Sequence, residues 1–174
     1  MQEIYERARR TLLAVFDVDG VLTDGALYFS DSGEEIKAFN VRDGHGMKML
    51  QESGVKLAII TSRNSRCVEA RARGLGIDLL YQGVSDKLAA FQDLLARLEL
   101  DAGAAAYMGD DVIDLPVMRR CGLALTVADA PAAVRNHAHY VSRVRGGCGA
   151  VREVCELVMH AQGTLAAHTA SYLK

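Results

Sequence analysis

Short, uninterrupted apolar runs recur along this sequence and constrain its fold more than any other feature. Such a run is typical of a strand that is buried on both faces of a parallel sheet. Four runs are clear and two are weaker, in this order: residues 11–17, 55–61, 104–108, 123–127, 77–81 and 139–142. Longer amphipathic segments lie between them. The alternation predicts an α/β fold with five or six strands in a mainly parallel sheet, covered by helices on both faces.

The amphipathic segments predict the helices of this fold. After a first helix near the amino terminus, we expect helices at about residues 43–53, 64–74, 85–98, 111–120, 131–138 and 150–162. Asp43, Ser85 and Asp129 are candidate N-caps, because short polar side chains accept hydrogen bonds from the first N–H groups of a helix. The chain has 174 residues, half of them hydrophobic, which suffices for one core. We therefore predict a single domain over residues 1–174, ending in a glycine-rich tail and C-terminal helix at 146–174.

One segment departs from the alternation and predicts a protruding β-hairpin over residues 26–40. The stretches 26–30 and 35–40 flank Asp31-Ser32-Gly33-Glu34, in which glycine suits a tight turn. A lone two-stranded hairpin is marginally stable in water, so its apolar side chains need a partner surface. These side chains are Leu27, Phe29, Ile36 and Phe39. Joining the hairpins of several copies edge to edge would bury them, which predicts a homo-oligomer.

Composition argues against several classes of function. The chain has 20 basic and 22 acidic residues, and the basic ones are scattered, so nothing predicts a nucleic-acid-binding surface. No apolar run is long enough to span a membrane, and the charged start MQEIYERARR is unlike a secretory signal. The cysteines lie far apart and form no C-x-x-C pair: Cys67, Cys121, Cys148 and Cys155. We therefore expect reduced thiols and a cytoplasmic location.

Polar residues follow several of the predicted strands at the point where each ends. Ligands of open parallel sheets bind at this carboxyl edge. Asp17 and Asp19 follow the first strand, and they point the same way because they are two residues apart in an extended chain. The other polar residues at this edge are Thr61, Lys87, Asp110, Asp111 and Asp114. The pattern predicts one acidic site that also contains a hydroxyl group and an amine.

In order and spacing, these residues resemble the motifs of the haloacid dehalogenase (HAD) superfamily. The matching stretches are DVDGVLTDG at 17–25, IITSR at 59–63, Lys87 and GDDVID at 109–114. A D-x-D-G sequence alone would be a weak signal, whereas four motifs in order are specific. The resemblance implies a Rossmann-like three-layer fold and a phosphoryl-transfer enzyme.

The resemblance also implies a role for each motif. Asp17 would attack phosphorus to form an aspartyl phosphate, while Asp19 gives a proton to the leaving group and later takes one from water. Two like charges near a protein surface repel by about 4 kcal/mol, so a cation must neutralise the site. Mg²⁺ fits that need, with oxygen ligands from the Asp17 carboxylate, the Asp19 carbonyl and the Asp110 carboxylate. Thr61 and Lys87 would bind the phosphoryl oxygens.

Asp111 and Asp114 have two possible roles. They could orient Lys87 and the waters on the metal, or they could simply cap the following helix.

A phosphorelay receiver domain is an alternative from a different class of protein. This signalling module also combines an α/β fold, clustered acidic residues, Thr or Ser, and Lys. In receivers, however, the phosphorylated Asp follows the third strand, whereas here D-x-D-G comes first. The order favours the hydrolase.

In this superfamily a cap domain can be inserted between the first and second motifs or between the second and third. This sequence has no such insertion, so the site of a monomer would lie open to water. The resemblance narrows to the capless sugar-acid phosphatases of lipopolysaccharide synthesis, which act on 3-deoxy-D-manno-octulosonate 8-phosphate. Four stretches carry it: 17–25, 39–50, 59–77 with 81–87, and 146–158. Ser62 and Cys148 depart from that family, which usually has Gly and Arg at these positions.

This narrower resemblance implies a homotetramer joined through the hairpins. It also implies that the substrate contacts Gly20, Arg63, Arg71 and Lys87, because a guanidinium can bind both oxygens of a carboxylate. A phosphatase of a nine-carbon, sialic-type acid 9-phosphate is the alternative. Those relatives tend to have Glu at the Arg63 position, which favours the eight-carbon substrate.

Overall fold

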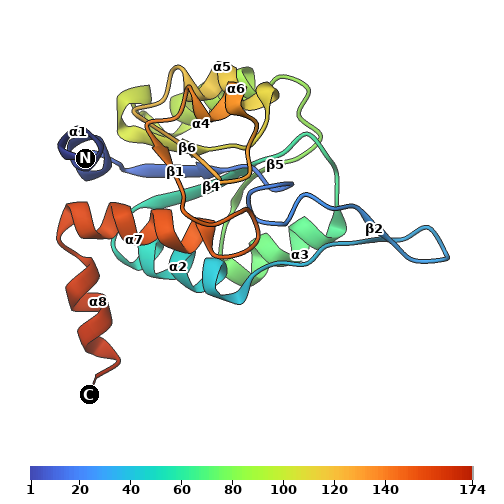
Figure 1. Ribbon diagram of the computed structural model, residues 1–174, viewed down its shortest axis with the longest axis horizontal. Helices are drawn as coiled ribbons and strands as arrows, with labels where there is room; N and C mark the ends of the chain where they lie inside the picture. Colours follow the sequence, from blue (N-terminus) through green and yellow to red (C-terminus); the bar gives the residue numbers. More distant parts are fainter. Residues whose placement is uncertain (174) are drawn as a thin grey trace.

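A sheet of six parallel strands forms the centre of the computed structural model, which describes residues 1–173 (Figure 1). The strands lie in the order β5-β4-β1-β6-β7-β8. Their bounds are β1 Leu13–Phe16, β4 Lys56–Ile60, β5 Leu79–Tyr81, β6 Ala105–Met108, β7 Leu123–Thr126 and β8 Tyr140–Val141. All six arise from the apolar runs, and β1, β4, β6 and β7 are almost wholly buried. The prediction of an α/β fold with a parallel sheet is confirmed.

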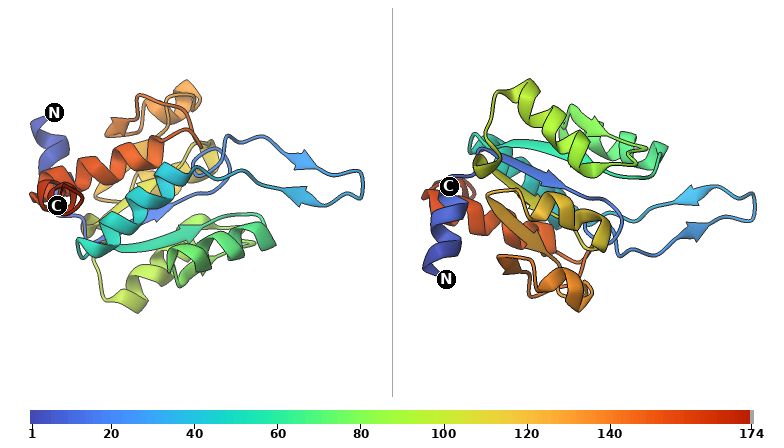
Figure 2. Two further views of the ribbon diagram at one scale, coloured as in Figure 1. Left: turned by 90° about the horizontal axis from the view of Figure 1, so that it is seen from below. Right: turned by 90° about the horizontal axis from the view of Figure 1, so that it is seen from above.

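Helices cover both faces of this sheet and make three layers (Figures 1 and 2). One face carries α2 (Val41–Glu52), α3 (Arg66–Leu75) and α7 (Ala150–Gln162). The other carries α4 (Lys87–Leu98), α5 (Leu115–Met118) and α6 (Ala132–Arg135). The helices α1 (Gln2–Arg9) and α8 (Leu165–Ser171) lie toward the amino ends of the strands. Among residues 1–173, no helix is long and apolar enough to cross a bilayer.

The predicted hairpin projects from the opposite end of the sheet, beyond the carboxyl ends of the strands (Figures 1 and 2). Its antiparallel strands are β2 (Tyr28–Phe29) and β3 (Glu35–Ile36). They are shorter than the predicted 26–30 and 35–40, because the segment after Ile36 turns back to the body of the molecule. There the Lys37 amine contacts Asp19, and Asn40 begins α2.

The three predicted N-caps are wrong, and the reason for Asp43 lies in tertiary structure. Asn40 caps α2, since its side chain accepts hydrogen bonds from the N–H groups of Arg42 and Asp43. The buried Asp43 carboxylate turns to another helix and accepts the N–H groups of Gly149 and Arg152. It therefore satisfies free donors at the start of α7 rather than at the start of its own helix.

The other two caps differ for local reasons. Asp86, not Ser85, caps α4 by accepting the Ala89 N–H at 3.0 Å. The Asp129 carboxylate accepts the Gly146 N–H at 3.1 Å instead of capping α6, which is a single turn.

Two predicted helices are shorter than expected, and one helix was not predicted. The 131–138 helix is reduced to α6. The 111–120 helix is divided into the 3₁₀ turn η2 (Val112–Asp114) and the short α5. Residues 150–162 match α7, and α8 follows it as an additional helix. A further 3₁₀ turn, η1 (Ala102–Ala104), precedes β6.

Candidate active site

A pocket of about 250 Å³ opens at the carboxyl ends of β1, β4 and β6. Its lining brings together most of the predicted site: Asp17, Asp19, Gly25, Thr61, Ser62, Arg63, Lys87, Asp110, Asp111 and Ile113. The three strands are neighbours in the sheet, and β1 lies between the other two. Residues that are up to 96 positions apart in the sequence therefore meet because parallel strands end at one edge.

The Asp17 carboxylate lies at the end of β1 and is almost fully buried. Its Oδ1 accepts the Val18 N–H at 2.7 Å, and its Oδ2 lies 2.7 Å from the Lys87 Nζ. Lys87 is the first residue of α4 and is also buried, with its Nζ 2.7 Å from the Asp114 Oδ1. A buried amine is stable when it is paired in this way, so Lys87 holds Asp17 in a defined orientation.

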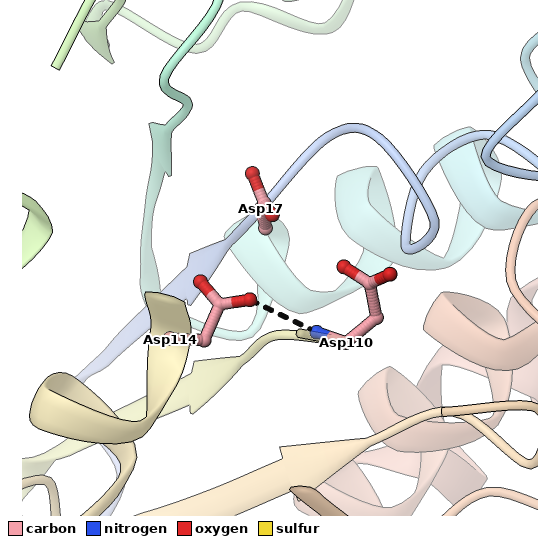
Figure 3. A group of neighbouring side chains, drawn as sticks. All are labelled: Asp17, Asp110 and Asp114. Atoms are coloured by element: carbon pink, nitrogen blue, oxygen red, sulfur yellow. Dashed lines mark hydrogen bonds between the residues drawn. The ribbon is translucent and has the colours of Figure 1, made fainter. Parts of the chain in front are cut away.

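Asp114 is the fully buried centre of a hydrogen-bond network beneath the pocket. Its Oδ1 accepts hydrogen bonds from the Lys87 amine and from the Tyr107 hydroxyl at 2.6 Å. Its Oδ2 accepts the main-chain N–H groups of Asp110 and Asp111, each at 3.1 Å. Figure 3 shows the bond to Asp110. Both oxygens are thus occupied, so Asp114 is suited to holding its neighbours in place.

Asp111 has the capping role that was one of its two predicted possibilities, while its role in orienting Lys87 and the waters on a metal stays a prediction. Its side chain accepts the Val112 N–H at 2.7 Å and forms a reciprocal cap with Asp114 at the start of η2. It also lines the pocket.

The Asp110 carboxylate lies beside Asp17 and differs from Asp114 in its partners (Figure 3). Within residues 1–173, no hydrogen bond or ion pair of the Asp110 side chain is present, although the residue is half-buried. It approaches the loop after β1 so closely that a Cβ at Gly20 would overlap its carboxylate. Gly20 also has a φ of +84°, which favours glycine.

Proximity of these carboxylates disfavours their charged forms. Burial and the charge of Asp114 raise the pKa of Asp17 to about 6, against the opposing effect of Lys87. Burial and the charges of Asp17 and Asp114 raise the pKa of Asp110 to about 7. Burial alone would lower the pKa of Lys87, but Asp17 and Asp114 outweigh it and raise that pKa. The site has more negative charge than Lys87 balances, and a cation would relieve the excess.

The donor set fits a hard divalent cation. Oxygen atoms of Asp17, Asp110 and Asp114 can all lie within 4.8 Å of one another. Because Asp114 already accepts four hydrogen bonds, the available carboxylates are those of Asp17 and Asp110. Carboxylate and carbonyl oxygens without thiolate or imidazole are the ligands that Mg²⁺ prefers.

A second group of charges lies at the hairpin side of the pocket, and two of its members, Asp19 and Arg63, line the pocket. The Lys37 amine contacts Asp19 Oδ1 and lies 3.3 Å from Glu35 Oε1. Arg63 lies 2.8 Å from the same Glu35 oxygen through its NH2 and 3.9 Å from Asp19 Oδ2 through its Nε. Two cations and two anions alternate in this group, which connects β3 to the loops after β1 and β4.

Two predicted substrate contacts lie outside the pocket lining of the single chain. Gly20 is in the loop after β1 but does not line the pocket, and its observed role is to make room for Asp110. Arg71 lies in a groove between α2 and α3, where it donates to the Asn40 carbonyl at 3.0 Å and stacks on Phe39. The predicted contacts of Gly20 and Arg71 with a substrate stay predictions.

Sequence reasoning missed three residues that organise the site, namely Glu35, Lys37 and Tyr107. A signal for the first two was present, because positions 35 and 37 are two apart and face the same way in an extended chain. Tyr107 lies in an apolar run, and the sequence alone does not indicate that its hydroxyl donates a hydrogen bond to Asp114.

Comparisons with known proteins identify the family of this chain. A family model for haloacid dehalogenase-like hydrolases matches residues 77–151. The 3-deoxy-D-manno-octulosonate 8-phosphate phosphatase of Yersinia pestis is 51% identical over 94% of this chain and 87% of its own length. The corresponding phosphatase of Moraxella catarrhalis, solved with magnesium, phosphate and KDO, has a TM-score of 0.97 and 42% identity, covering 99% of both chains.

A third relative carries a different metal. The cobalt-bound form of the Haemophilus influenzae deoxy-D-mannose-octulosonate 8-phosphate phosphatase has a TM-score of 0.92 and 39% identity. The match covers 97% of this chain and 99% of that one. Fold, motif order and identity over nearly the full length therefore agree, and the chain belongs to the 3-deoxy-D-manno-octulosonate 8-phosphate phosphatase family of haloacid dehalogenase-like hydrolases.

Proposed function

We propose that this chain is a Mg²⁺-dependent phosphatase that hydrolyses 3-deoxy-D-manno-octulosonate 8-phosphate, with Asp17 as the nucleophile. The observation that carries the proposal is the position of the Asp17 carboxylate, which lines an open pocket beside the Lys87 amine and the Asp110 carboxylate. Asp19 lines the same pocket two residues later, where it can serve as proton donor and acceptor. Nucleophile and proton carrier thus reach one bound phosphate.

The residues divide the reaction into two steps. In the first, Asp17 forms a bond to phosphorus as the bond to the sugar oxygen breaks, and Asp19 gives that oxygen a proton. In the second, Asp19 takes a proton from water, whose oxygen attacks phosphorus and releases inorganic phosphate and free Asp17. Thr61 and Lys87 bind the phosphoryl oxygens in both steps.

Mg²⁺ is the cation that we assign to the site. The Asp17 and Asp110 carboxylates and the Asp19 carbonyl would hold it, while Asp114 keeps Lys87 and the 110–111 main chain in place. When bound, Mg²⁺ neutralises carboxylate charge and stabilises the charge on the phosphoryl group. The magnesium in the Moraxella catarrhalis relative supports this assignment.

The sugar-acid part of the substrate would lie toward the hairpin side of the pocket. Arg63 is at that side and is partly exposed, so its guanidinium can meet a carboxylate. Arg71 and Gly20 stay predicted contacts, and Arg71 would need a neighbouring subunit or a movement to reach the substrate. The KDO bound by the Moraxella catarrhalis relative supports an eight-carbon acid.

We also propose that residues 1–174 act as one domain within a homotetramer that is joined through the hairpins. The exposed Leu27, Tyr28, Phe29 and Ile36 support this arrangement, because they form an apolar surface on a projecting element. A cytoplasmic location is consistent with the four cysteines, which are free thiols.

A phosphate-release screen tests the function. The purified chain is assayed with Mg²⁺ on octulosonate 8-phosphate, a nonulosonate 9-phosphate and glucose 6-phosphate, and again after EDTA treatment. We expect repeated turnover with the highest kcat/KM on the octulosonate, no activity after EDTA, recovery with Mg²⁺ and suppression by Ca²⁺. A preference for the nine-carbon acid would assign the alternative substrate. A stable phosphorylated protein without turnover would indicate a receiver domain.

A further inference from the structure

Lys37 is a buried charge in an element that otherwise projects into solvent. Its side chain is 2% exposed, although Lys37 as a whole residue is half-buried and the neighbouring Ile36 is exposed. A lysine amine is buried at this depth only when anions replace its water. Here Asp19 and Glu35 are those anions. Of the two, Asp19 belongs to the loop that carries the proposed nucleophile.

The two carboxylate oxygens of Asp19 have different partners. Lys37 binds Oδ1, whereas Oδ2 is 3.9 Å from the Arg63 Nε, and the Asp19 side chain remains 25% exposed in the pocket. An unrestrained aspartate can rotate about two torsions. With one oxygen held by the buried amine, the other is left to face the pocket.

Glu35, at the base of the hairpin, also fixes the position of the Lys37 amine. Glu35 lies 3.3 Å from the Lys37 amine and also binds Arg63 at 2.8 Å. The Glu35 carbonyl additionally accepts a hydrogen bond from the Cys67 thiol at the start of α3. The position of the amine is therefore fixed by β3 and by residues after β4, and not by the Asp19 loop alone.

We propose that Lys37 is a positioning residue of this enzyme, which fixes the Asp19 carboxylate in the orientation for proton transfer. The inference rests on the proposed function and extends it, because it makes the base of the hairpin part of the catalytic machinery. Among residues 1–173, Lys37 is not itself part of the pocket lining and forms no ion pair with Asp17, so it acts through Asp19, which does line the pocket. Small displacements of a catalytic group can lower a rate by about 100-fold.

The experiment compares Lys37→Met with the wild type and with Lys56→Met. Lys56 is exposed at the amino end of β4, so its variant loses the same charge far from the pocket. Each protein is assayed on octulosonate 8-phosphate with Mg²⁺, and inorganic phosphate serves as a competitive inhibitor. Circular dichroism and light scattering check folding and assembly.

We expect Lys37→Met to lower kcat by about 10- to 100-fold. Its KM and phosphate inhibition constant should change by less than about threefold, since ground-state binding is kept. Lys56→Met should match the wild type. If Lys37→Met does not fold, Lys37→Arg keeps the charge and the donors, and a kcat loss with unchanged KM is expected there as well.

A double-mutant cycle separates positioning from a structural effect. In an Asp19→Asn background, Lys37→Met should lower kcat by less than about twofold, because the group that it positions is already altered. A full second loss in that background would overturn the inference. So would wild-type kcat in Lys37→Met, or a raised KM with unchanged kcat, which would indicate direct substrate contact. A wild type that releases no phosphate overturns the proposed function itself.

Discussion

Asp17 is the residue on which the proposed chemistry depends, and its neighbours explain why asparagine is an informative replacement. Asp17→Asn keeps the shape and can still interact with the Val18 N–H, but it removes the nucleophilic oxygen. We expect kcat to fall at least about 1,000-fold, as for other removed nucleophiles, with an unchanged circular dichroism spectrum. Asp78→Asn, an exposed aspartate before β5, serves as the control.

The result also tests the covalent route. Near-wild-type phosphate release by Asp17→Asn together with an inactive Asp110→Asn would indicate direct attack by metal-activated water, because only the cation site would then be needed.

His139 gives a pH prediction away from the pocket. Its Nδ1 accepts the Ala124 N–H at 2.8 Å, which requires the imidazole to leave that nitrogen unprotonated. Burial and the nearby Arg7 lower the pKa of His139 in the folded chain. The unfolded chain takes up the proton at the higher, ordinary pKa of about 6.5. The contribution of His139 to the free energy of unfolding should therefore fall as the pH drops below that value.

Urea unfolding at pH 7.5 and pH 5.5 measures this effect. His139→Asn keeps an acceptor near the Nδ1 position but does not titrate, so it should lose less stability between the two pH values than the wild type. His137→Asn changes an exposed histidine two residues away and should keep the wild-type difference. Equal pH dependence in wild type and His139→Asn would show that this imidazole does not carry the effect.

At the scale of elements, residues 146–149 form a glycine strap that links α7 to the loop after β1. The Gly147 N–H donates to the Val21 carbonyl at 2.9 Å, and the Asn40 side chain donates to the Gly147 carbonyl at 3.2 Å. Asp43 holds the Gly149 end of the strap. Because the strap lies against the loop that follows Asp17, its fit should influence the active site.

Gly146→Ala tests that influence. A Cβ at Gly146 would overlap the Gly20 carbonyl oxygen, so the strap or the loop must shift. We expect a loss of about 1–3 kcal/mol in the free energy of unfolding, together with a lower kcat. Gly74→Ala in α3 is the matched control, since nothing lies within 4 Å of its added methyl group. It should be neutral or stabilising by up to about 1 kcal/mol. An equally stable and active Gly146→Ala would contradict the proposed coupling.

The same elements show how far the sequence can predict structure. The buried strands were predictable because runs such as 55–61 are apolar without interruption, and the motif residues follow them directly. The N-cap positions were not predictable in the same way. Asp43, for example, accepts its hydrogen bonds from residues at the start of α7, more than 100 positions later in the chain. Lys37 was missed for a similar reason. In a short hairpin a lysine is expected to face solvent, and only the folded chain brings Asp19 to it.

At the scale of the whole molecule, the hairpin lies at one end, and the amino terminus and α8 lie toward the other (Figure 1). The pocket is at the hairpin end, because its lining follows the carboxyl ends of the strands. The pocket is therefore open to solvent beside the projecting hairpin with its exposed apolar side chains. A hairpin from another copy could cover both at once, so assembly and water exclusion would depend on the same surface.

Charged substitutions on the hairpin test the proposed tetramer. Phe29 is 59% exposed and Leu27 is 52% exposed, so glutamate at either position costs little in an isolated chain but opposes an apolar interface. We expect Leu27→Glu/Phe29→Glu to give species smaller than the proposed wild-type tetramer in light scattering, with weaker turnover of octulosonate 8-phosphate. Leu12→Glu is the matched control, because Leu12 is also 52% exposed but precedes β1 at the opposite end of the sheet. It should keep the wild-type mass and rate. A fully active monomer, whether wild type or variant, would overturn both the tetramer and its coupling to catalysis.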